Sequence, residues 1–403
     1  MEYYLVGIKG TGMSSLACML YDLGYSVRGC DVLEDFDFLE ELKKRNIQID
    51  EINKTDIIEK IGDVIYIISS AYEDTLILEK IREHDYSYFY YQEYLSMIPA
   101  IQIAVAGTHG KTTTTKMIAD ILKDESISYV VGSGEGLGKK NFRYFLYEAC
   151  EYKRHFLNYH PDYLVITNIE YDHPDYYKSI DDVRDAFETL KKQSKVVINK
   201  NEYKYKILKT SDKGFLIRIY QHNRKPQHYF LPFCGKHMIE NFMDAYRVIK
   251  RLGFTDSYIK KRIKNITLPK RRSEEVVYKK TIIIKDYAHH PSEIKALHDT
   301  IKQKYPSLKT TAFFEPHTYS RTLALIDDFK ESLSLFDKVY INDVFTSARE
   351  IKNNNLQKTI DERLKDFEKF TEKIAETYNY DEEGIVVFLG AGTIIKYSPL
   401  LKK

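Results

Sequence analysis

The sequence has few cysteines, and none of them are clustered. Among 403 residues it contains only Cys18, Cys30, Cys150 and Cys234, with no C-x-x-C pair, and it has no tryptophan although tyrosine occurs 34 times. Structural zinc sites need closely spaced thiolates or histidines, and disulfide scaffolds need a denser set of cysteines. The pattern therefore excludes both of these classes and predicts reduced thiols. The tyrosine bias indicates no particular function.

The sequence also lacks an excess of charge of one sign. Lys and Arg total 61 against 59 for Asp and Glu, so the formal net charge is +2, and no long basic block occurs. Nucleic-acid-binding proteins concentrate positive charge in patches or tails. We therefore expect no nucleic-acid partner.

Long hydrophobic runs are missing. No apolar run approaches the ~18 residues that span a bilayer, and Met1-Glu2 continues directly into a strand pattern without a basic and then apolar leader. These features predict a cytoplasmic protein that does not associate with membranes.

Repeated strand, glycine turn and helix patterns are present instead, and they predict an α/β fold. With 43% apolar residues, a chain of this length can form two or three domains. Ile98-Pro99 reads as a linker, and a polar stretch follows Leu268. The predicted domains are 1–98, 99–268 and 269–403, and the outer two are Rossmann-like.

A phosphate-binding loop is predicted at the start of the middle domain. A short apolar strand, Ile103 to Ala106, leads into a turn that opens an amphipathic helical run, and the turn consists of Gly107, Thr108, His109, Gly110, Lys111, Thr112 and Thr113. Glycines let backbone N–H groups approach phosphate oxygens, a lysine reaches the outer phosphates, and a threonine can bind Mg²⁺. Only two residues separate the glycines instead of the usual four, so an accidental Gly-Lys-Thr at a strand-helix junction is the alternative.

A second glycine turn lies near the N-terminus. It contains Gly10, Thr11 and Gly12, and Asp31 follows the next strand, where an acid can meet a ribose. Ser69 and Ser70 end another buried strand. Tight packing of helix on strand explains this glycine spacing equally well.

Further polar residues follow predicted strands in the middle domain. Glu148 ends one strand and His173 follows another, which suggests metal ligands together with Thr112. An isolated acid at a strand end is usually just solvated. The stretch Gly132 to Gly138 appears too rich in glycine for regular structure and is predicted to be a mobile substrate loop, with a surface hairpin as the alternative.

In the last domain, histidines and arginines follow successive strands and are expected on one rim of a parallel sheet. These residues are His289, His290, His317, Arg321 and Arg349. His237 and Asn241 lie four residues apart on a predicted helix and so share a face, although capping or surface roles are common for such pairs.

Taken together, these motifs resemble the Mur ligase family, and most closely its alanine-adding branch. The resemblance rests on nine segments in family order between residues 7 and 350: Gly7-Ile-Lys-Gly-Thr-Gly, Ser69-Ser-Ala, Gly107-Thr-His-Gly-Lys-Thr-Thr, Glu148-Ala-Cys-Glu, Thr167-Asn-Ile-Glu-Tyr-Asp-His-Pro, Gly235-Lys-His, Asp286-Tyr-Ala-His-His-Pro-Ser-Glu, Pro316-His-Thr-Tyr-Ser-Arg and Ser347-Ala-Arg-Glu. It implies three domains and ligation of L-alanine to UDP-N-acetylmuramate, with ATP and Mg²⁺ as cofactors.

The resemblance also implies residue roles. Lys111 and Arg272 would act on the transferring phosphate, and Asp286 would bind the ATP ribose. His237 and Asn241 would contact adenine. Thr112 and Glu148 would hold one Mg²⁺ and His173 a second, while the five rim residues would form the alanine pocket, with an unidentified histidine as base. Arg271-Arg-Ser273 and Cys150 depart from the family pattern, and residues 200–234 are short for it.

Several alternatives remain open from the sequence. A tripeptide-recycling ligase would use the same chemistry, whereas a folate polyglutamate ligase would leave the N-terminal glycine turn without a role. Two alternatives come from other functional classes: a nucleotide-binding protein that has lost catalysis, and a dinucleotide-dependent oxidoreductase. Monomer and homodimer are both compatible with the sequence.

Overall fold

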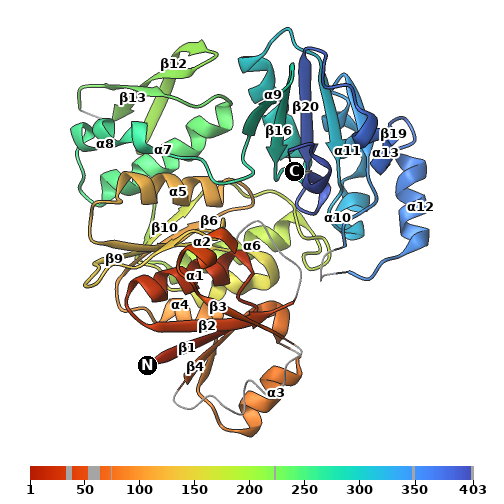
Figure 1. Cartoon of the computed structure of the whole chain (residues 1–403). Coiled ribbons are helices and arrows are strands. Elements are labelled where there is room, and N and C mark those ends of the chain that lie inside the picture. The colour runs from red at the N-terminus through yellow and green to blue at the C-terminus, as the bar shows by residue number, and fades with distance from the viewer. Residues whose placement is uncertain (33–38, 53–63, 74, 222–223, 347–349, 401–403) are drawn as a thin grey trace. The chain divides into compact units, whose positions relative to one another are not determined.

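The computed structural model describes residues 1–32, 39–52, 64–73, 75–221, 224–346 and 350–400. The chain forms two compact units (Figure 1). The first contains residues 1–170, 181–202 and 241–267, and the second contains residues 171–180, 203–240 and 268–403. Within the described parts of the chain, no helix is long and apolar enough to cross a membrane.

The first unit begins with a parallel five-stranded sheet. Its strands, in the order β3-β2-β1-β4-β5, are β1 (Glu2–Val6), β2 (Ser26–Asp31), β3 (Gln48–Glu51), β4 (Val64–Ile68) and β5 (Tyr88–Tyr90). The accompanying helices are α1 (Thr11–Asp22), α2 (Leu39–Lys44), α3 (Leu76–Glu83) and α4 (Tyr91–Ser96). The central strands are apolar and buried, which confirms the strand and helix predicted around the N-terminal glycine turn.

A six-stranded sheet forms the rest of the core of the first unit. Its order is β11-β10-β6-β9-β7-β8, with strands β6 (Ile101–Ala106), β7 (Ile127–Val130), β8 (Gly136–Leu137), β9 (Tyr144–Ala149), β10 (Tyr163–Ile166) and β11 (Val196–Val197). The helices of this region are α5 (Lys111–Ile121), α6 (Ile180–Gln193), α7 (Lys236–Arg251) and α8 (Asp256–Arg262), and α7 also contributes residues to the second unit. From Thr113 onward every residue of α5 is buried. The prediction of an amphipathic helix with one exposed face was therefore wrong.

The glycine-rich stretch after β7 turns back into the short strand β8, so it forms a hairpin, which was the alternative to the predicted irregular loop. Strand β8 pairs antiparallel with β7, and the glycines on either side of Leu137 lie against the backbone of α1. A Cβ on Gly136 would stand 1.8 Å from Ser15 O, and one on Gly138 would stand 2.1 Å from Met19 O. The glycines are therefore needed for close backbone packing.

The second unit contains a small antiparallel sheet and a larger mixed one. The small sheet consists of β12 (Tyr203–Ser211), β13 (Gly214–Gln221) and β14 (Gln227–Leu231). The larger sheet has the order β15-β16-β20-β17-β18-β19, with β15 (Glu274–Tyr278), β16 (Thr281–Asp286), β17 (Thr310–Phe314), β18 (Lys338–Ile341), β19 (Glu368–Lys369) and β20 (Gly384–Leu389). Its helices are α9 (Pro291–Lys304), α10 (Tyr319–Ala324), α11 (Ile326–Leu333), α12 (Asn354–Arg363) and α13 (Glu372–Thr377).

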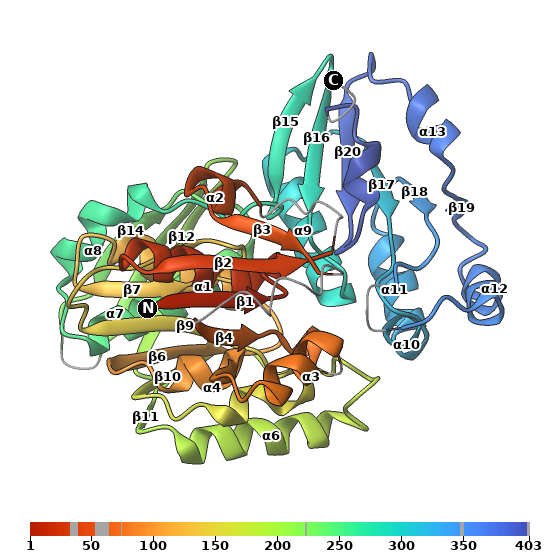
Figure 2. The same cartoon turned by 60° about the horizontal axis from the view of Figure 1, so that its bottom comes forward.

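The larger sheet is buried on both faces. Adjacent residues of β17 belong to different hydrophobic clusters, since Ala312 and Phe314 pack on one face and Phe313 on the other. Strands β16, β20, β17 and β18 are parallel and lie side by side (Figure 2). Their carboxyl ends therefore share one edge, and the segments that carry His289 and His317 begin there, as predicted.

Candidate active site

The predicted phosphate loop joins β6 to the N-terminus of α5. Gly110 precedes the helix in the left-handed region (φ +78°), and no side chain caps the helix there. A Cβ on Gly107 would stand 2.0 Å from Thr167 Oγ1, and one on Gly110 would stand 2.3 Å from Asn241 Oδ1. Only glycine fits at these two positions, and the first helical N–H groups are directed as an anion site requires.

Lys111 is folded back onto this loop. Its Nζ donates to Gly107 O and to Thr108 O at 3.0 Å, and it lies 2.9 Å from Glu151 Oε2. Burial lowers the pKa of Lys111, but Glu151 and the other acidic groups nearby together outweigh burial, and the net direction is upward. The loop therefore holds a charged lysine. Sequence reasoning missed Glu151 as its partner, although this residue stands in the quoted Glu-Ala-Cys-Glu motif.

Two predicted metal ligands contact each other, one in the loop and one beside it. Thr112 Oγ1 donates to Glu148 Oε2 at 3.0 Å, and Glu148 Oε1 accepts from the Gly132 N–H. A hydroxyl and a carboxylate are the hard oxygen donors that suit Mg²⁺, so these residues fit the implied ion. Thr113, the next loop residue, is buried in α5.

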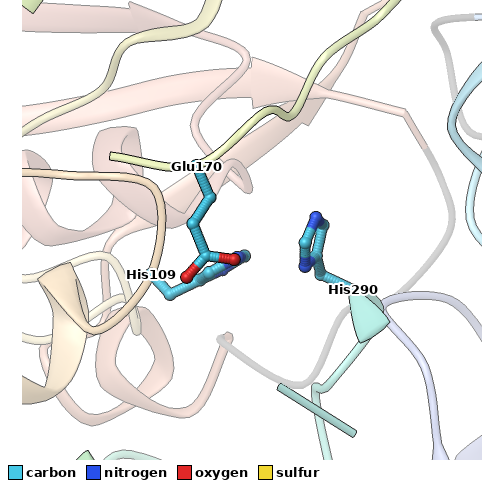
Figure 3. A group of neighbouring side chains, drawn as sticks. All are labelled: His109, Glu170 and His290. Atoms are coloured by element: carbon cyan, nitrogen blue, oxygen red, sulfur yellow. The ribbon is translucent and has the colours of Figure 1, made fainter. Parts of the chain in front are cut away.

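His109 is fixed in the loop mainly through its backbone. Its N–H donates to Asn168 Oδ1 at 2.9 Å, and its carbonyl accepts from Thr167 Oγ1 and Asn168 Nδ2. The His109 ring lies near the Glu170 carboxylate, with 3.8 Å between Nε2 and Oε2 (Figure 3). The Thr-Asn-Ile-Glu segment thus braces the phosphate loop, a role that the sequence did not reveal.

The N-terminal glycine turn has a similar brace. Asp31 is buried, and its carboxylate accepts from Lys9 N at 2.6 Å and from the Tyr72 hydroxyl at 2.7 Å. Helix α1 starts at Thr11 after Gly10, and Gly12 approaches the Tyr91 hydroxyl, which would stand 2.8 Å from a Cβ there.

Ser69 and Ser70 follow β4, as predicted, and Ser69 caps the short 3₁₀ turn Ser70–Tyr72. The ring of Tyr72 lies so close to Gly7 that a Cβ on this glycine would stand 2.6 Å from it. Tyr72 was missed because its contacts with Asp31 and Gly7 join stretches that are distant in the sequence.

In the second unit, Arg272 and Asp286 are close to the start of α9. Asp286 accepts from Ser273 N and Ala288 N, each at 2.7 Å, and burial raises the pKa of this carboxyl. Arg272 Nη1 lies 3.3 Å from Glu293 Oε1. Burial lowers the pKa of His237 in α7 to about 4, and the charge of Arg272 lowers it further in the same direction.

Three predicted histidines lie at the rim of the larger sheet. The rings of His289 and His317 meet edge to face at 5.6 Å. His290 caps α9, with its Nδ1 accepting from Ser292 N and its Nε2 close to Tyr171 O. Burial lowers the pKa of His289 to about 3, with the Arg321 charge adding to the shift, so this ring is neutral at pH 7.

Arg321 is engaged by a carboxylate that the sequence analysis did not single out. Its Nε and Nη2 lie 2.7 and 3.2 Å from the two Asp172 oxygens, and its Nη1 lies 2.9 Å from His317 Nδ1. Burial raises the pKa of Asp172, but the charge and hydrogen bonds of Arg321, together with the nearby His173, outweigh burial and hold this pKa well below its usual range.

The structure thus assembles most of the predicted residues in two groups. The loop residues, Glu148 and Asn241 are together in the first unit, whereas Arg272, Asp286, His289, His290, His317 and Arg321 are together in the second. His173 also belongs to the second unit, where its Nε2 lies 3.7 Å from Asp172 Oδ2. Arg349 lies outside the described residues.

Comparison with known protein families gives three matches along the chain. Residues 2–100 match the Mur ligase family catalytic domain, residues 105–214 the Mur ligase middle domain, and residues 271–392 the Mur ligase glutamate ligase domain. The matched regions follow one another in the order that the predicted three-domain organisation requires.

Two curated relatives match nearly the whole chain. The UDP-N-acetylmuramate–L-alanine ligase of Ligilactobacillus salivarius is 38% identical, covering 98% of this chain and 95% of the relative. The enzyme of the same name from Levilactobacillus brevis is 36% identical over the same shares. Among solved structures, the UDP-N-acetylmuramate-alanine ligase MurC of Thermotoga maritima has the same fold, with a TM-score of 0.81, 24% identity and coverage of 100% and 98% of the two chains.

Proposed function

Because the chain belongs to the Mur ligase family, we propose that it is an ATP-dependent ligase that joins L-alanine to the lactyl carboxylate of UDP-N-acetylmuramate. The observation that carries this proposal is the 38% identity to an enzyme of that name over 98% of the chain. The phosphate loop and the histidine and arginine rim would supply the chemistry that such a reaction needs. The product is a precursor of peptidoglycan.

The reaction requires activation of a carboxylate. A carboxylate oxygen is a poor leaving group, so the γ-phosphoryl group of ATP is first transferred to it, giving an acyl phosphate and ADP. The amine of alanine attacks the acyl carbon, the C–O bond to phosphate breaks, and a histidine of the rim would take up the proton that the amine nitrogen loses. The amide forms, and inorganic phosphate leaves with the electron pair of that bond.

The loop in the first unit suits the nucleotide. Lys111 and the backbone N–H groups of Thr108 to Thr113 would hold the β- and γ-phosphates, and Lys111 must exchange its contact with Glu151 for phosphate oxygens. Arg272 would neutralise charge on the transferring group. His237 and Asn241 would contact adenine, and Asp286 the ribose.

Magnesium is the implied metal ion. Thr112 and Glu148 would hold one ion, since they already present oxygen donors 3.0 Å apart, and His173 would bind a second. When bound, such ions neutralise phosphate charge and orient the transferring group.

The remaining predicted residues suit the two other substrates. Gly10, Thr11, Gly12, Asp31, Ser69 and Ser70 would form the UDP-N-acetylmuramate site, with Tyr72 fixing Asp31. His289, His290, His317, Arg321 and Arg349 would form the alanine pocket, where arginine recognises the amino-acid carboxylate. Substrates of this kind are consistent with a cytoplasmic location.

Phosphate release tests the proposal. Purified protein is supplied with ATP, Mg²⁺ and UDP-N-acetylmuramate, and either L-alanine or an L-alanyl-D-glutamyl-diamino acid tripeptide is added in parallel. Alanine-dependent release with a product one residue heavier is expected, and Lys111→Ala should abolish it. Release with the tripeptide alone would move the protein to the recycling branch, and no release with either would contradict ligation.

A further inference from the structure

Glu293 is a carboxylate that stands between two residues of the proposed ligation site. It lies in the first turn of α9, and its side chain is 12% exposed. Its Oε1 is 3.3 Å from Arg272 Nη1, whereas its Oε2 accepts from His289 N at 3.1 Å and lies 3.4 Å from His289 Nδ1. One side chain therefore contacts both the arginine assigned to the transferring phosphate and a histidine assigned to the amino-acid pocket.

The hydrogen bonds around His289 also define which ring nitrogen carries the proton. Its Nδ1 lies 2.9 Å from Tyr287 O and near Glu293 Oε2, and both of these oxygens can only accept. Nδ1 must therefore be the protonated nitrogen of the neutral ring, which leaves the lone pair on Nε2. His317 is the opposite case, because its Nδ1 accepts from the Arg321 guanidinium.

We propose that Glu293 is a positioning residue of the ligation reaction, which aligns the Arg272 guanidinium with the transferring phosphate and holds His289 so that its Nε2 lone pair can accept a hydrogen bond from the substrate amine. This inference rests on the proposed function. It assigns to one carboxylate the placement of both the residue that acts on the phosphate and the residue that contacts the amino acid. Glu293 itself does not contact the reacting atoms.

A negative carboxylate suits this position better than a neutral side chain. Both of its partners present N–H donors, and one donor belongs to a charged guanidinium, so two acceptor oxygens are needed. An amide has only one oxygen. In Glu293→Gln, either Arg272 or His289 would face an NH₂ group and turn away from its position.

The test compares Glu293→Gln with Glu331→Gln, which removes an exposed carboxylate from helix α11. Steady-state constants are measured for all three substrates, together with thermal melting. We expect Glu293→Gln to lower kcat on the order of tenfold to hundredfold, because small misplacements of reacting groups have effects of this size. The KM for UDP-N-acetylmuramate should stay unchanged, and Glu331→Gln should match the wild type in every constant.

A purely structural role gives a different result. If Glu293→Gln melts at a lower temperature but keeps the wild-type kcat and KM values, the inference is overturned. If this variant does not fold, the kinetics of Glu293→Asp test the inference instead. The aspartate keeps the negative charge, but its shorter side chain cannot reach both Arg272 and His289. A lowered kcat in the aspartate variant supports positioning, and wild-type kinetics contradict it.

The same experiment separates this inference from the proposed function. Wild-type protein that shows no alanine-dependent phosphate release would remove the proposed function and this inference with it. Active wild-type protein with an unaltered Glu293→Gln variant would overturn the inference alone.

Discussion

At the scale of single residues, the candidate site contains residues that can be recognised from sequence motifs and contact partners that cannot. Lys111, Thr112 and Glu148 stand in contiguous motifs whose chemistry can be read directly, and the structure brings them together. Glu151 and Asp172 were missed because an acid in a sequence gives no sign of which cation it will meet. Their roles depend on contacts that only the folded chain creates.

The pair of Lys111 and Glu151 makes a prediction about stability. Their side chains are 15% and 3% exposed, so Glu151→Gln leaves a buried lysine without its charged partner. Removing one member of a buried ion pair costs about 3 to 5 kcal/mol. The melting temperature of the first unit should fall clearly.

The matched control is Glu188→Gln, which removes the partner of Lys191 from an exposed pair on α6. Exposed pairs contribute about 0 to 1 kcal/mol, so the melting temperature of this variant should stay close to that of the wild type. Equal shifts in the two variants would show that the Lys111 pair is not stabilising.

At the scale of helices and strands, the alternation of strand, turn and helix could be predicted because buried parallel strands are continuous apolar runs. The structure of the segment around Gly136 could not be predicted in this way. Its composition indicates a loop, and the reason for its glycines is the approach of α1, which begins more than a hundred residues earlier in the chain. Backbone contacts of this kind leave no periodic signal in the sequence.

Gly136→Ala tests this explanation. The new Cβ would stand 1.8 Å from Ser15 O, and a backbone atom cannot move aside as a flexible side chain does. Overpacking of this kind costs about 1 to 3 kcal/mol or more. Calorimetry should show a lower melting temperature.

Gly384→Ala is the control for this substitution. Its nearest neighbour would be Lys309 O at 3.4 Å, which is an ordinary contact. A Gly136→Ala variant as stable as this control would refute the close approach of α1.

At the scale of the whole molecule, the three family matches run through both compact units. The predicted phosphate loop is in the first unit, and the described residues of the histidine and arginine rim are in the second. The fold class and the family could be recognised from motif order. The side chains that contact the motif residues could not be recognised from the sequence.

Stability should depend on pH because two histidines of the second unit are held neutral. Burial lowers the pKa of His237 to about 4 and that of His289 to about 3, and the charges of Arg272 and Arg321, respectively, add to these shifts. An unfolded histidine titrates near 6.5. Between these values the unfolded chain binds more protons than the folded one, so stability falls as the pH drops from about 6.5 to 4.

His237→Gln should reduce this dependence. Its melting temperature should fall less than that of the wild type between pH 6.5 and 4.5, because about one proton fewer is taken up on unfolding. Above pH 8 the two melting curves should shift with pH in parallel. Equal losses in the acidic range would contradict a buried neutral His237.

The most direct test of the account follows oxygen atoms through the reaction. UDP-N-acetylmuramate labelled with ¹⁸O in both lactyl carboxylate oxygens is incubated with ATP, Mg²⁺ and L-alanine, and the products are analysed by mass spectrometry. An acyl phosphate transfers one labelled oxygen to inorganic phosphate and leaves the other in the amide product. Labelled phosphate in equal amount to the alanyl product is the predicted result, and alanyl product with unlabelled phosphate would contradict the mechanism.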